Sequence, residues 1–81
     1  MHLHFTATAD EHLNRLPHRL QVRIIEKLEL YASQPDPLQF AEPLTGSFEY
    51  RFRVEGYRIF FEVLNDTIWV NAIKRRDEAY R

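Results

Sequence analysis

Residues 48–73 largely alternate between apolar and polar side chains, and two short turn sequences divide them into three runs. The turns are Glu55-Gly56 and Asn65-Asp66, and the flanking runs are rich in aromatic and β-branched residues. This pattern predicts three antiparallel strands joined by two tight hairpins. We expect the strands at about residues 48–54, 57–64 and 67–73.

Two-residue turns also determine which residues lie opposite one another. The pairs expected in the first hairpin are Val54–Tyr57, Phe52–Ile59, Tyr50–Phe61 and Phe48–Val63. The pairs expected in the second hairpin are Val63–Ile68, Phe61–Val70 and Ile59–Ala72. All of these side chains fall on one apolar face, and a slip of one residue would turn every one of them to the other face. This face is therefore the expected core.

The first half of the chain predicts one strand, two helices and a loop. Alternation in residues 2–6 fits a short strand. Thr8 and Glu11 have the spacing of a capping box, which predicts a helix over about residues 9–16. Pro17 suits the first turn of a second helix, which ends before Pro35 and Pro37. Its apolar positions recur at intervals of three or four, at Leu20, Ile24, Leu28 and Tyr31. Residues 39–47 are expected to form a loop.

These elements predict a single α+β domain over residues 1–81, because 81 residues leave room for one core only. Its elements follow the order β-α-α-β-β-β. An N-terminal strand comes first, a helical hairpin packs on one face of a mainly antiparallel sheet, and a short basic tail ends the chain. The hydrophobic share of 44% is enough for a core and argues against disorder.

Several classes of protein are excluded by what the chain lacks. It has no cysteine, so it contains neither a disulfide nor a thiolate zinc site. The four histidines do not combine with carboxylates into a metal-ligand pattern, so we expect no metal and no cofactor. No apolar run approaches 18 residues and the start lacks the features of a signal peptide. We therefore expect a cytoplasmic protein that does not contact a membrane.

The face opposite the expected core is basic and aromatic. Its residues are Glu49, Arg51, Arg53, Arg58, Phe60, Glu62, Trp69, Asn71 and Ile73. Arg53 lies opposite Arg58, and like charges in this position destabilise a strand pair. A bound phosphate would remove the repulsion, since guanidinium groups bind phosphate in a bidentate manner. Phe60 and Trp69, expected to be exposed, would be able to stack on bases.

A less specific interpretation of this face remains open. Arginines on a strand face are usually only solvated, and Glu49, Glu55 and Glu62 are available to pair with them. A protein partner would explain two exposed aromatic residues equally well.

The charge is distributed unevenly along the chain. Residues 1–49 hold 4 Lys/Arg and 7 Asp/Glu, whereas residues 50–81 hold 7 Lys/Arg and 5 Asp/Glu. Lys74, Arg75 and Arg76 come directly after the last expected strand, where Lys74 would lie opposite Tyr57 and near Arg58. Consecutive cations at a strand end are most often a solubility feature. Beside the arginines of the sheet, they would also concentrate positive charge around one patch.

Three stretches of the chain resemble the RelE/ParE toxin superfamily of bacterial toxin–antitoxin systems. They are EPLTGSFEYRFRV, GYRIFFEV and the closing IKRRDEAYR. The resemblance covers essentially the whole chain and implies a toxin that a cognate antitoxin neutralises by wrapping around it. Toxins of the RelE branch enter the ribosome and cleave messenger RNA by driving the ribose 2′-OH into the adjacent phosphate. Assemblies of toxin and antitoxin in this superfamily are commonly of higher order.

The resemblance also implies roles for individual residues. Arg58 matches the arginine that clamps the phosphate. Lys74 or a neighbouring arginine matches a basic residue at the end of the last strand, and Tyr80 matches a C-terminal tyrosine that orients the substrate or nucleophile. Arg51 and Arg53 match positions where the RelE branch often has basic groups. With Arg75 and Arg76, and with Phe60 and Trp69 of the basic and aromatic face, they are the residues that we expect to bind RNA. An arginine is a poor general base because its pKa exceeds 12. The base therefore stays open between Lys74 and Tyr80.

Two other functions stay open beside messenger-RNA cleavage. Toxins of the ParE branch inhibit DNA gyrase without cleaving RNA. A member of the superfamily without catalytic activity would only bind its antitoxin.

Overall fold

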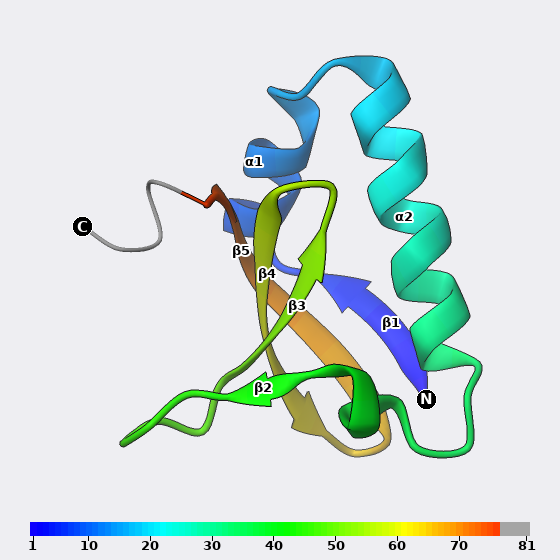
Figure 1. Ribbon diagram of the computed structural model, residues 1–81, viewed down its shortest axis with the longest axis vertical. Helices are drawn as coiled ribbons and strands as arrows, with labels where there is room; N and C mark the ends of the chain where they lie inside the picture. The colour runs from blue at the N-terminus through cyan, green and yellow to red at the C-terminus, as the bar shows by residue number, and fades with distance from the viewer. Residues whose placement is uncertain (77–81) are drawn as a thin grey trace.

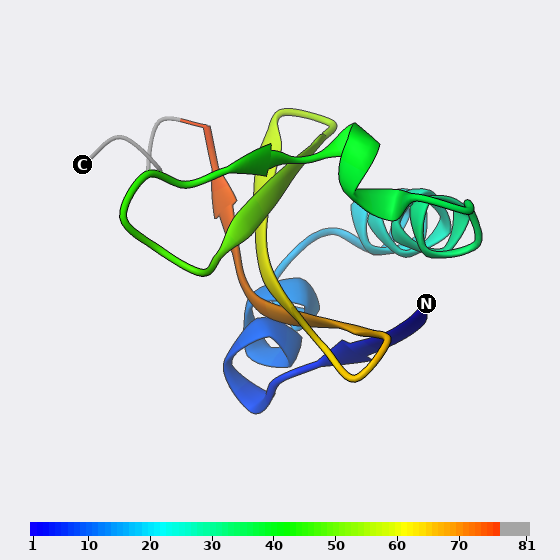
Figure 2. The ribbon, with the colours of Figure 1, turned by 90° about the horizontal axis from the view of Figure 1, so that it is seen from below.

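The computed structural model describes residues 1–76. Its elements are β1 (His2–Phe5), α1 (Ala7–Asn14), α2 (His18–Ala32), the 3₁₀ helix η1 (Pro37–Phe40), β2 (Glu42–Pro43), β3 (Tyr50–Val54), β4 (Tyr57–Leu64) and β5 (Thr67–Arg75). The strands form one sheet in the order β1-β5-β4-β3-β2, with β1 at one edge and β2 at the other (Figures 1 and 2). β1 runs parallel to β5, and the other pairs are antiparallel. The predicted α+β class and the mainly antiparallel sheet are confirmed.

The core lies between the two helices and one face of the sheet. Its largest fully buried side chains are Phe52, Phe61, Ile24, Leu28, Ile59, Ile68 and Val70. The ring of Phe52 stacks on Phe61 at a centroid distance of 4.3 Å and on Tyr31 of α2 at 4.7 Å. Burying each of these side chains contributes about 1.5–3 kcal/mol, so this layer holds the helices on the sheet.

The first hairpin has the predicted register except at its open end. The pairs Val54–Tyr57, Phe52–Ile59 and Tyr50–Phe61 are all present. Glu55 and Gly56 both have positive φ, 51° and 80°, as a tight two-residue hairpin turn requires. The expected pair Phe48–Val63 is wrong, because β3 begins only at Tyr50 and Phe48 is 92% exposed.

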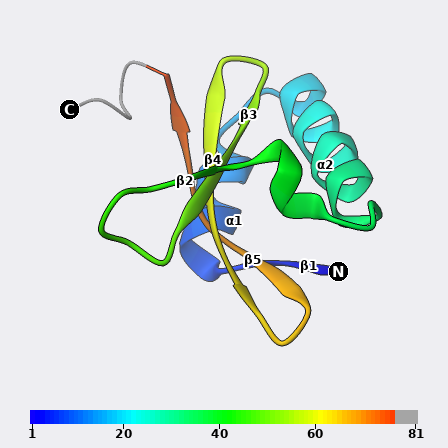
Figure 3. The same ribbon diagram turned by 60° about the horizontal axis from the view of Figure 1, so that its bottom comes forward.

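The second hairpin follows the prediction near its turn and departs from it farther along. Figure 3 shows the two hairpin turns at opposite ends of the sheet. Val63 pairs with Ile68 and Phe61 with Val70. Beyond them the register shifts, because Asn71 is an extra residue in β5.

The shift at Asn71 changes which residues lie opposite β4. Phe60 pairs with Ala72 instead of Asn71, Ile59 with Ile73 instead of Ala72, and Arg58 with Lys74. The predicted pair of Lys74 with Tyr57 is therefore wrong. The bulge turns Ile73 into the core, where it is 6% exposed, so its expected place on the polar face is also wrong. Lys74 is brought onto the same face as Arg58.

The first helix starts earlier than its capping pattern predicted. Thr6, not Thr8, is the N-cap, and its Oγ1 accepts a hydrogen bond of 3.2 Å from the amide of Ala9. Thr6 follows β1 directly and has an extended backbone with ψ of 164°, which is the geometry that an N-cap needs. The helix therefore begins where the strand ends.

The segment expected to be a plain loop contains η1 and the short edge strand β2. In β2, Glu42 pairs with Arg51 and Pro43 with Tyr50 of β3. A proline is tolerated there because an edge strand has one side without a partner strand. β5 is longer than predicted, so Lys74 and Arg75 belong to the sheet and not to a tail. Neither helix within residues 1–76 combines the length and the apolar character that a bilayer crossing requires.

Candidate anion-binding site

Three cationic residues lie side by side on the sheet face that the helices leave uncovered. Arg53 of β3 is opposite Arg58 of β4, which is opposite Lys74 of β5. Arg58, the central residue, is only 4% exposed, while Arg53 and Lys74 are exposed. A charged side chain is rarely buried to this extent unless other groups compensate its charge. We call these three residues the cation row.

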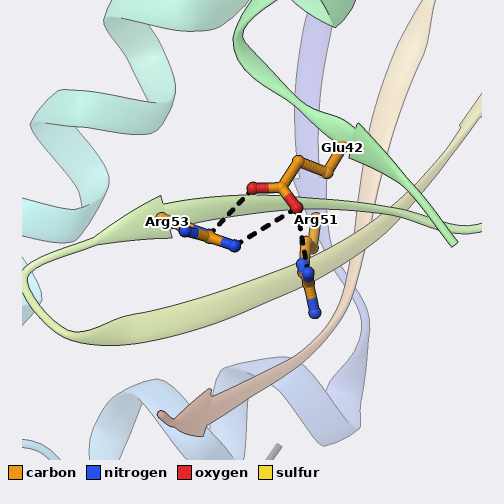
Figure 4. Close-up of polar contacts among 3 residues, drawn as sticks. All are labelled: Glu42, Arg51 and Arg53. Atoms are coloured by element: carbon orange, nitrogen blue, oxygen red, sulfur yellow. Dashed lines mark hydrogen bonds and ion pairs between the residues drawn. The ribbon is translucent and has the colours of Figure 1, made fainter.

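Glu42 of β2 binds Arg53 of the cation row and the neighbouring Arg51. Its Oε2 lies 2.9 Å from a terminal nitrogen of Arg51, and its Oε1 lies 2.9 Å from Nε of Arg53 (Figure 4). A second nitrogen of Arg53 donates to Oε2 at 3.3 Å. Arg53 therefore grips the carboxylate with two nitrogens, the geometry with which guanidinium groups also hold phosphate.

The arginines lower the pKa of Glu42. The hydrogen bond from Arg51 is the largest cause, and the charges of Arg53 and Arg58 act in the same direction. The carboxyl group is therefore ionised at neutral pH, and this region of the sheet stabilises a negative charge. Chemically, the arrangement is suited to binding an oxyanion, either a planar one such as a carboxylate or a tetrahedral one such as a phosphate.

Sequence reasoning missed Glu42, because it expected a loop there. The sequence did contain one indication of β2. The turn at Gly46-Ser47 reverses the chain, so that the residues before it run antiparallel to β3. Two of the glutamates that the sequence offered as partners for the arginines of this face, Glu49 and Glu55, contact other residues instead. Glu55 binds Arg23 of α2 at 2.6 Å, and Glu49 accepts a hydrogen bond of 3.0 Å from Asn71.

The two aromatic residues of this face are half-buried, so the prediction that they are exposed is wrong. The ring of Trp69 packs edge-on against His4 of β1 with 4.4 Å between centroids. Phe60 lies opposite Arg51 on one side and Ala72 on the other. Among residues 1–76, Nε1 of Trp69 and Nε of Arg51 are buried donors without a hydrogen-bond partner.

The basic residues at the end of β5 separate instead of gathering on one face. Lys74 lies opposite Arg58, whereas Arg75 lies opposite Tyr57, whose neighbours in register belong to the core face. The backbone amide of Arg76 donates to the carbonyl of Gly56 at 3.0 Å, which anchors the end of β5 beside the first hairpin turn. Tyr80, the expected catalytic tyrosine, lies outside the described residues.

Within residues 1–76, no group of three or more His, Asp or Glu side chains is placed to hold a metal ion. His4 contacts Trp69, and His12 accepts a hydrogen bond from the backbone of β5.

Comparison with known proteins places the chain in a family. The model of the ParE toxin of the type II toxin–antitoxin system parDE matches residues 3–80. No curated protein matches the chain.

Several solved structures have the same fold. The toxin–antitoxin complex RelBE2 from Mycobacterium tuberculosis contains a chain with a TM-score of 0.83 and 24% identity, covering 93% of this chain and 90% of its own. The RelB–RelE antitoxin–toxin complex from Methanococcus jannaschii contains a chain with a TM-score of 0.69 and 30% sequence identity. The match covers 94% of this chain and 93% of that one. The structure of the chromosomal ParDE system from P. aeruginosa contains a chain with a TM-score of 0.70 and 19% sequence identity. The match covers 93% of this chain and 95% of that one. The chain belongs to the family of ParE toxins of type II toxin–antitoxin systems, within the RelE/ParE superfamily.

Proposed function

We propose that this toxin is a ribosome-dependent messenger-RNA endoribonuclease that cleaves by attack of a ribose 2′-OH on the adjacent phosphate. The observation that carries the proposal is the cation row, with a nearly buried arginine between two exposed cations. Attack on a phosphate builds negative charge on its non-bridging oxygens. Fixed cations with little access to water stabilise that charge more strongly than solvated ones do.

The residues of the site take different roles in this proposal. Arg58 binds the phosphate as it becomes pentacovalent, and Arg51 and Arg53 hold its oxygens from the side of β3. Lys74 and Tyr80 transfer protons to and from the 2′-OH and the leaving oxygen. Arg75 and Arg76 add positive charge for the RNA backbone, and Phe60 and Trp69 stack on bases.

Glu42 supports the anion-binding part of the proposal. Its carboxylate already contacts Arg51 and Arg53 at 2.9 Å each, so these two arginines are oriented to hold oxygen atoms. In the proposal, a phosphate of the RNA takes over these contacts when the substrate binds.

The proposal includes partners as well as chemistry. The RelB–RelE structure from Methanococcus jannaschii is an antitoxin–toxin complex, and we infer that this toxin likewise has a cognate antitoxin that keeps it inactive. Its targets would be the cytoplasmic ribosome and the messenger RNA on it, and its complex with the antitoxin would be of higher order. A short reading frame directly beside this one would identify the antitoxin.

The test is expression in a bacterial host with sequencing of the ends of messages. The wild type should stop translation and leave cuts in phase with codons on ribosome-bound messages. Arg58→Lys keeps the charge but loses the planar guanidinium group that binds a phosphate with two nitrogens. The rate of cleavage should therefore fall by about a hundredfold or more. Arg19→Ala on α2, which removes an exposed cation away from the site, should cleave normally.

Because Arg58 is nearly buried, each variant is first checked for its native circular dichroism spectrum. A folded Arg58→Lys variant that cleaves as well as the wild type would contradict the proposal.

The second candidate is inhibition of DNA gyrase without RNA cleavage. The observation that favours it is the family model, which is that of the ParE toxins and matches residues 3–80. In this case expression should induce the DNA damage response and leave messages intact. A toxin that does neither, and does not slow growth, would be a non-catalytic member that only binds its antitoxin.

A further inference from the structure

On the side away from β4, β5 changes its partner halfway along its length. β1 pairs with it as far as Phe5, which lies opposite Val70, and the amide of Thr6 donates to the carbonyl of Val70 at 2.9 Å. The chain then turns into α1, whereas β5 continues to Arg75. Within residues 1–76, no strand pairs with β5 on this side beyond Val70, and α1 lies there instead (Figure 1). Backbone groups of β5 that point toward α1 therefore depend on the helix for partners.

Two side chains of the helix and its cap bind this part of β5. The hydroxyl of Thr6, the N-cap, donates to the carbonyl of the bulged residue Asn71 at 3.4 Å. His12, in the last turn of α1, accepts through Nδ1 a hydrogen bond of 3.1 Å from the backbone amide of Ile73. On the side of β4, the amide of Arg76 donates to a carbonyl of the first hairpin turn at 3.0 Å. The segment after the bulge is thus held from both sides.

The hydrogen bond to His12 requires one particular state of the ring. A ring nitrogen accepts a hydrogen bond only when it carries no proton, so the imidazole is neutral and its proton is on Nε2. Ile73 is 6% exposed, and a buried amide that loses its acceptor destabilises the structure around it. The ring is therefore a specific acceptor for β5 and does more than fill space.

The residue that follows Ile73 belongs to the cation row. Lys74 lies opposite Arg58, and successive side chains of a strand point to opposite faces. The amide that His12 holds is thus part of the backbone from which Lys74 reaches the polar face. A group that acts on a bound phosphate has to be held to within about 0.5 Å, which a loosely held strand end does not provide.

We propose that His12 is a positioning residue of the anion-binding site: its neutral ring holds the amide of Ile73 and thereby keeps Lys74 beside Arg58. The inference rests on the proposed function, in which Lys74 acts on the phosphate of the RNA, and extends it to a residue of α1. His12 does not touch the substrate in this role. It acts through the backbone of β5.

The first test uses the wild-type toxin labelled with ¹⁵N. At neutral pH, the nitrogen resonances of the His12 ring should show the proton on Nε2, and the amide of Ile73 should be protected against hydrogen exchange. A proton on Nδ1, or an Ile73 amide that exchanges as fast as one in an exposed loop, would overturn the inference. This result does not depend on any variant being folded.

Two substitutions of His12 separate the hydrogen bond from the stability of the helix. In His12→Asn the side-chain oxygen takes the place of Nδ1, because each atom is one bond from Cγ, and the amide of Ile73 keeps an acceptor. His12→Ala removes the acceptor, although alanine is the better helix former. Protection of the Ile73 amide should fall in His12→Ala and return in His12→Asn. The opposite order, which helix propensity alone predicts, would contradict the inference.

His18→Ala is the matched control. His18 is an exposed histidine at the start of α2, and its replacement should leave the protection of the Ile73 amide unchanged.

A double-mutant cycle tests whether His12 acts through Lys74. The measurement is the affinity for a short single-stranded RNA with a 2′-deoxy substitution that blocks cleavage. His12→Ala should weaken binding several-fold in the wild-type background, but by less than about twofold when Lys74→Gln is already present. A purely structural role would give the same loss in both backgrounds, and that result would overturn the inference.

Failure of this inference is distinguishable from failure of the proposed function. A toxin that makes codon-phased cuts, but in which the losses from His12→Ala and Lys74→Gln add, loses only the positioning role. A toxin that cuts no messages, but in which the two losses overlap, loses only the nuclease activity.

Discussion

At the scale of single residues, the carboxylate of Glu42 is the group that pairs with the arginines of the basic face. The like charges of Arg53 and Arg58 do lie opposite each other, as the hairpin register predicts. The sequence suggested that a bound phosphate would remove their repulsion. Part of that role is filled by the chain itself, because Glu42 binds Arg53. In this structure the carboxylate of Glu42 therefore holds the place beside Arg51 and Arg53 that the proposal gives to a phosphate.

We predict that Glu42→Gln binds RNA more tightly than the wild type. The amide keeps the shape of the side chain and removes its charge, so Arg51 and Arg53 no longer have to exchange a carboxylate for a phosphate. Affinity for a non-cleavable single-stranded RNA at fixed salt is the measurement. Glu62→Gln, an exposed residue of β4 with the same charge change, is the control. A gain of equal size in both variants would show only the change in net charge.

The pH dependence of this effect follows from the lowered pKa of Glu42. A group whose pKa is lower in the folded protein stabilises the fold above its unfolded pKa, and the contribution is lost as the pH falls through the folded value. The advantage of Glu42→Gln in RNA binding should therefore persist from neutral pH down to the ordinary glutamate value of 4.5, and disappear only when the pH falls through the lower pKa of the folded protein, where the wild-type side chain also becomes neutral. Binding measured from neutral to acidic pH tests this, and an advantage that stays constant would contradict it.

At the scale of secondary structure, the start of α1 offers a direct comparison of two caps. Thr6→Ala should lower the free energy of unfolding by about 1 kcal/mol, because it removes the acceptor for the amide of Ala9. Thr8→Ala, at the position that the capping pattern favoured, should have no such cost, since alanine is the better helix former. Denaturation in urea measures both, and a larger loss for Thr8→Ala would contradict the observed cap.

The bulge in β5 is the element that assembles the cation row. Without the extra residue Asn71, the regular register would have placed Lys74 opposite Tyr57 on the core face. The bulge instead places Lys74 opposite Arg58 and Ile73 in the core. Bulges often re-aim side chains near functional sites in this way.

At the scale of the whole molecule, one layer of packing holds helices and sheet together. Leu28 of α2 is fully buried, so Leu28→Ala should lower the free energy of unfolding by about 2–5 kcal/mol. This is a large share of what a domain of this size has available. Leu30→Ala on the same helix, where the side chain is 51% exposed, should change it by less than about 0.5 kcal/mol. Thermal or urea unfolding compares the two, and similar losses would contradict the assigned core face of α2.

The sequence alone was sufficient to predict the α+β class, the first hairpin between its turn and the Tyr50–Phe61 pair, and the core face of the sheet as far as the bulge in β5. The reason is local: strand side chains alternate with a period of two, and the two-residue turns set the register, so Phe52 had to face Ile59. The same argument placed Arg53 opposite Arg58.

Only the tertiary structure decided the bulge at Asn71, the pairing of Glu42 with Arg51 and Arg53, and the position of Lys74. Each of these depends on contacts between residues far apart in the chain. Asn71 contacts Glu49 and the side chain of Thr6, and these contacts leave no periodic pattern to read. A strand as short as β2 is likewise too brief to show alternation, so the carboxylate that completes the site became visible only when the sheet was assembled.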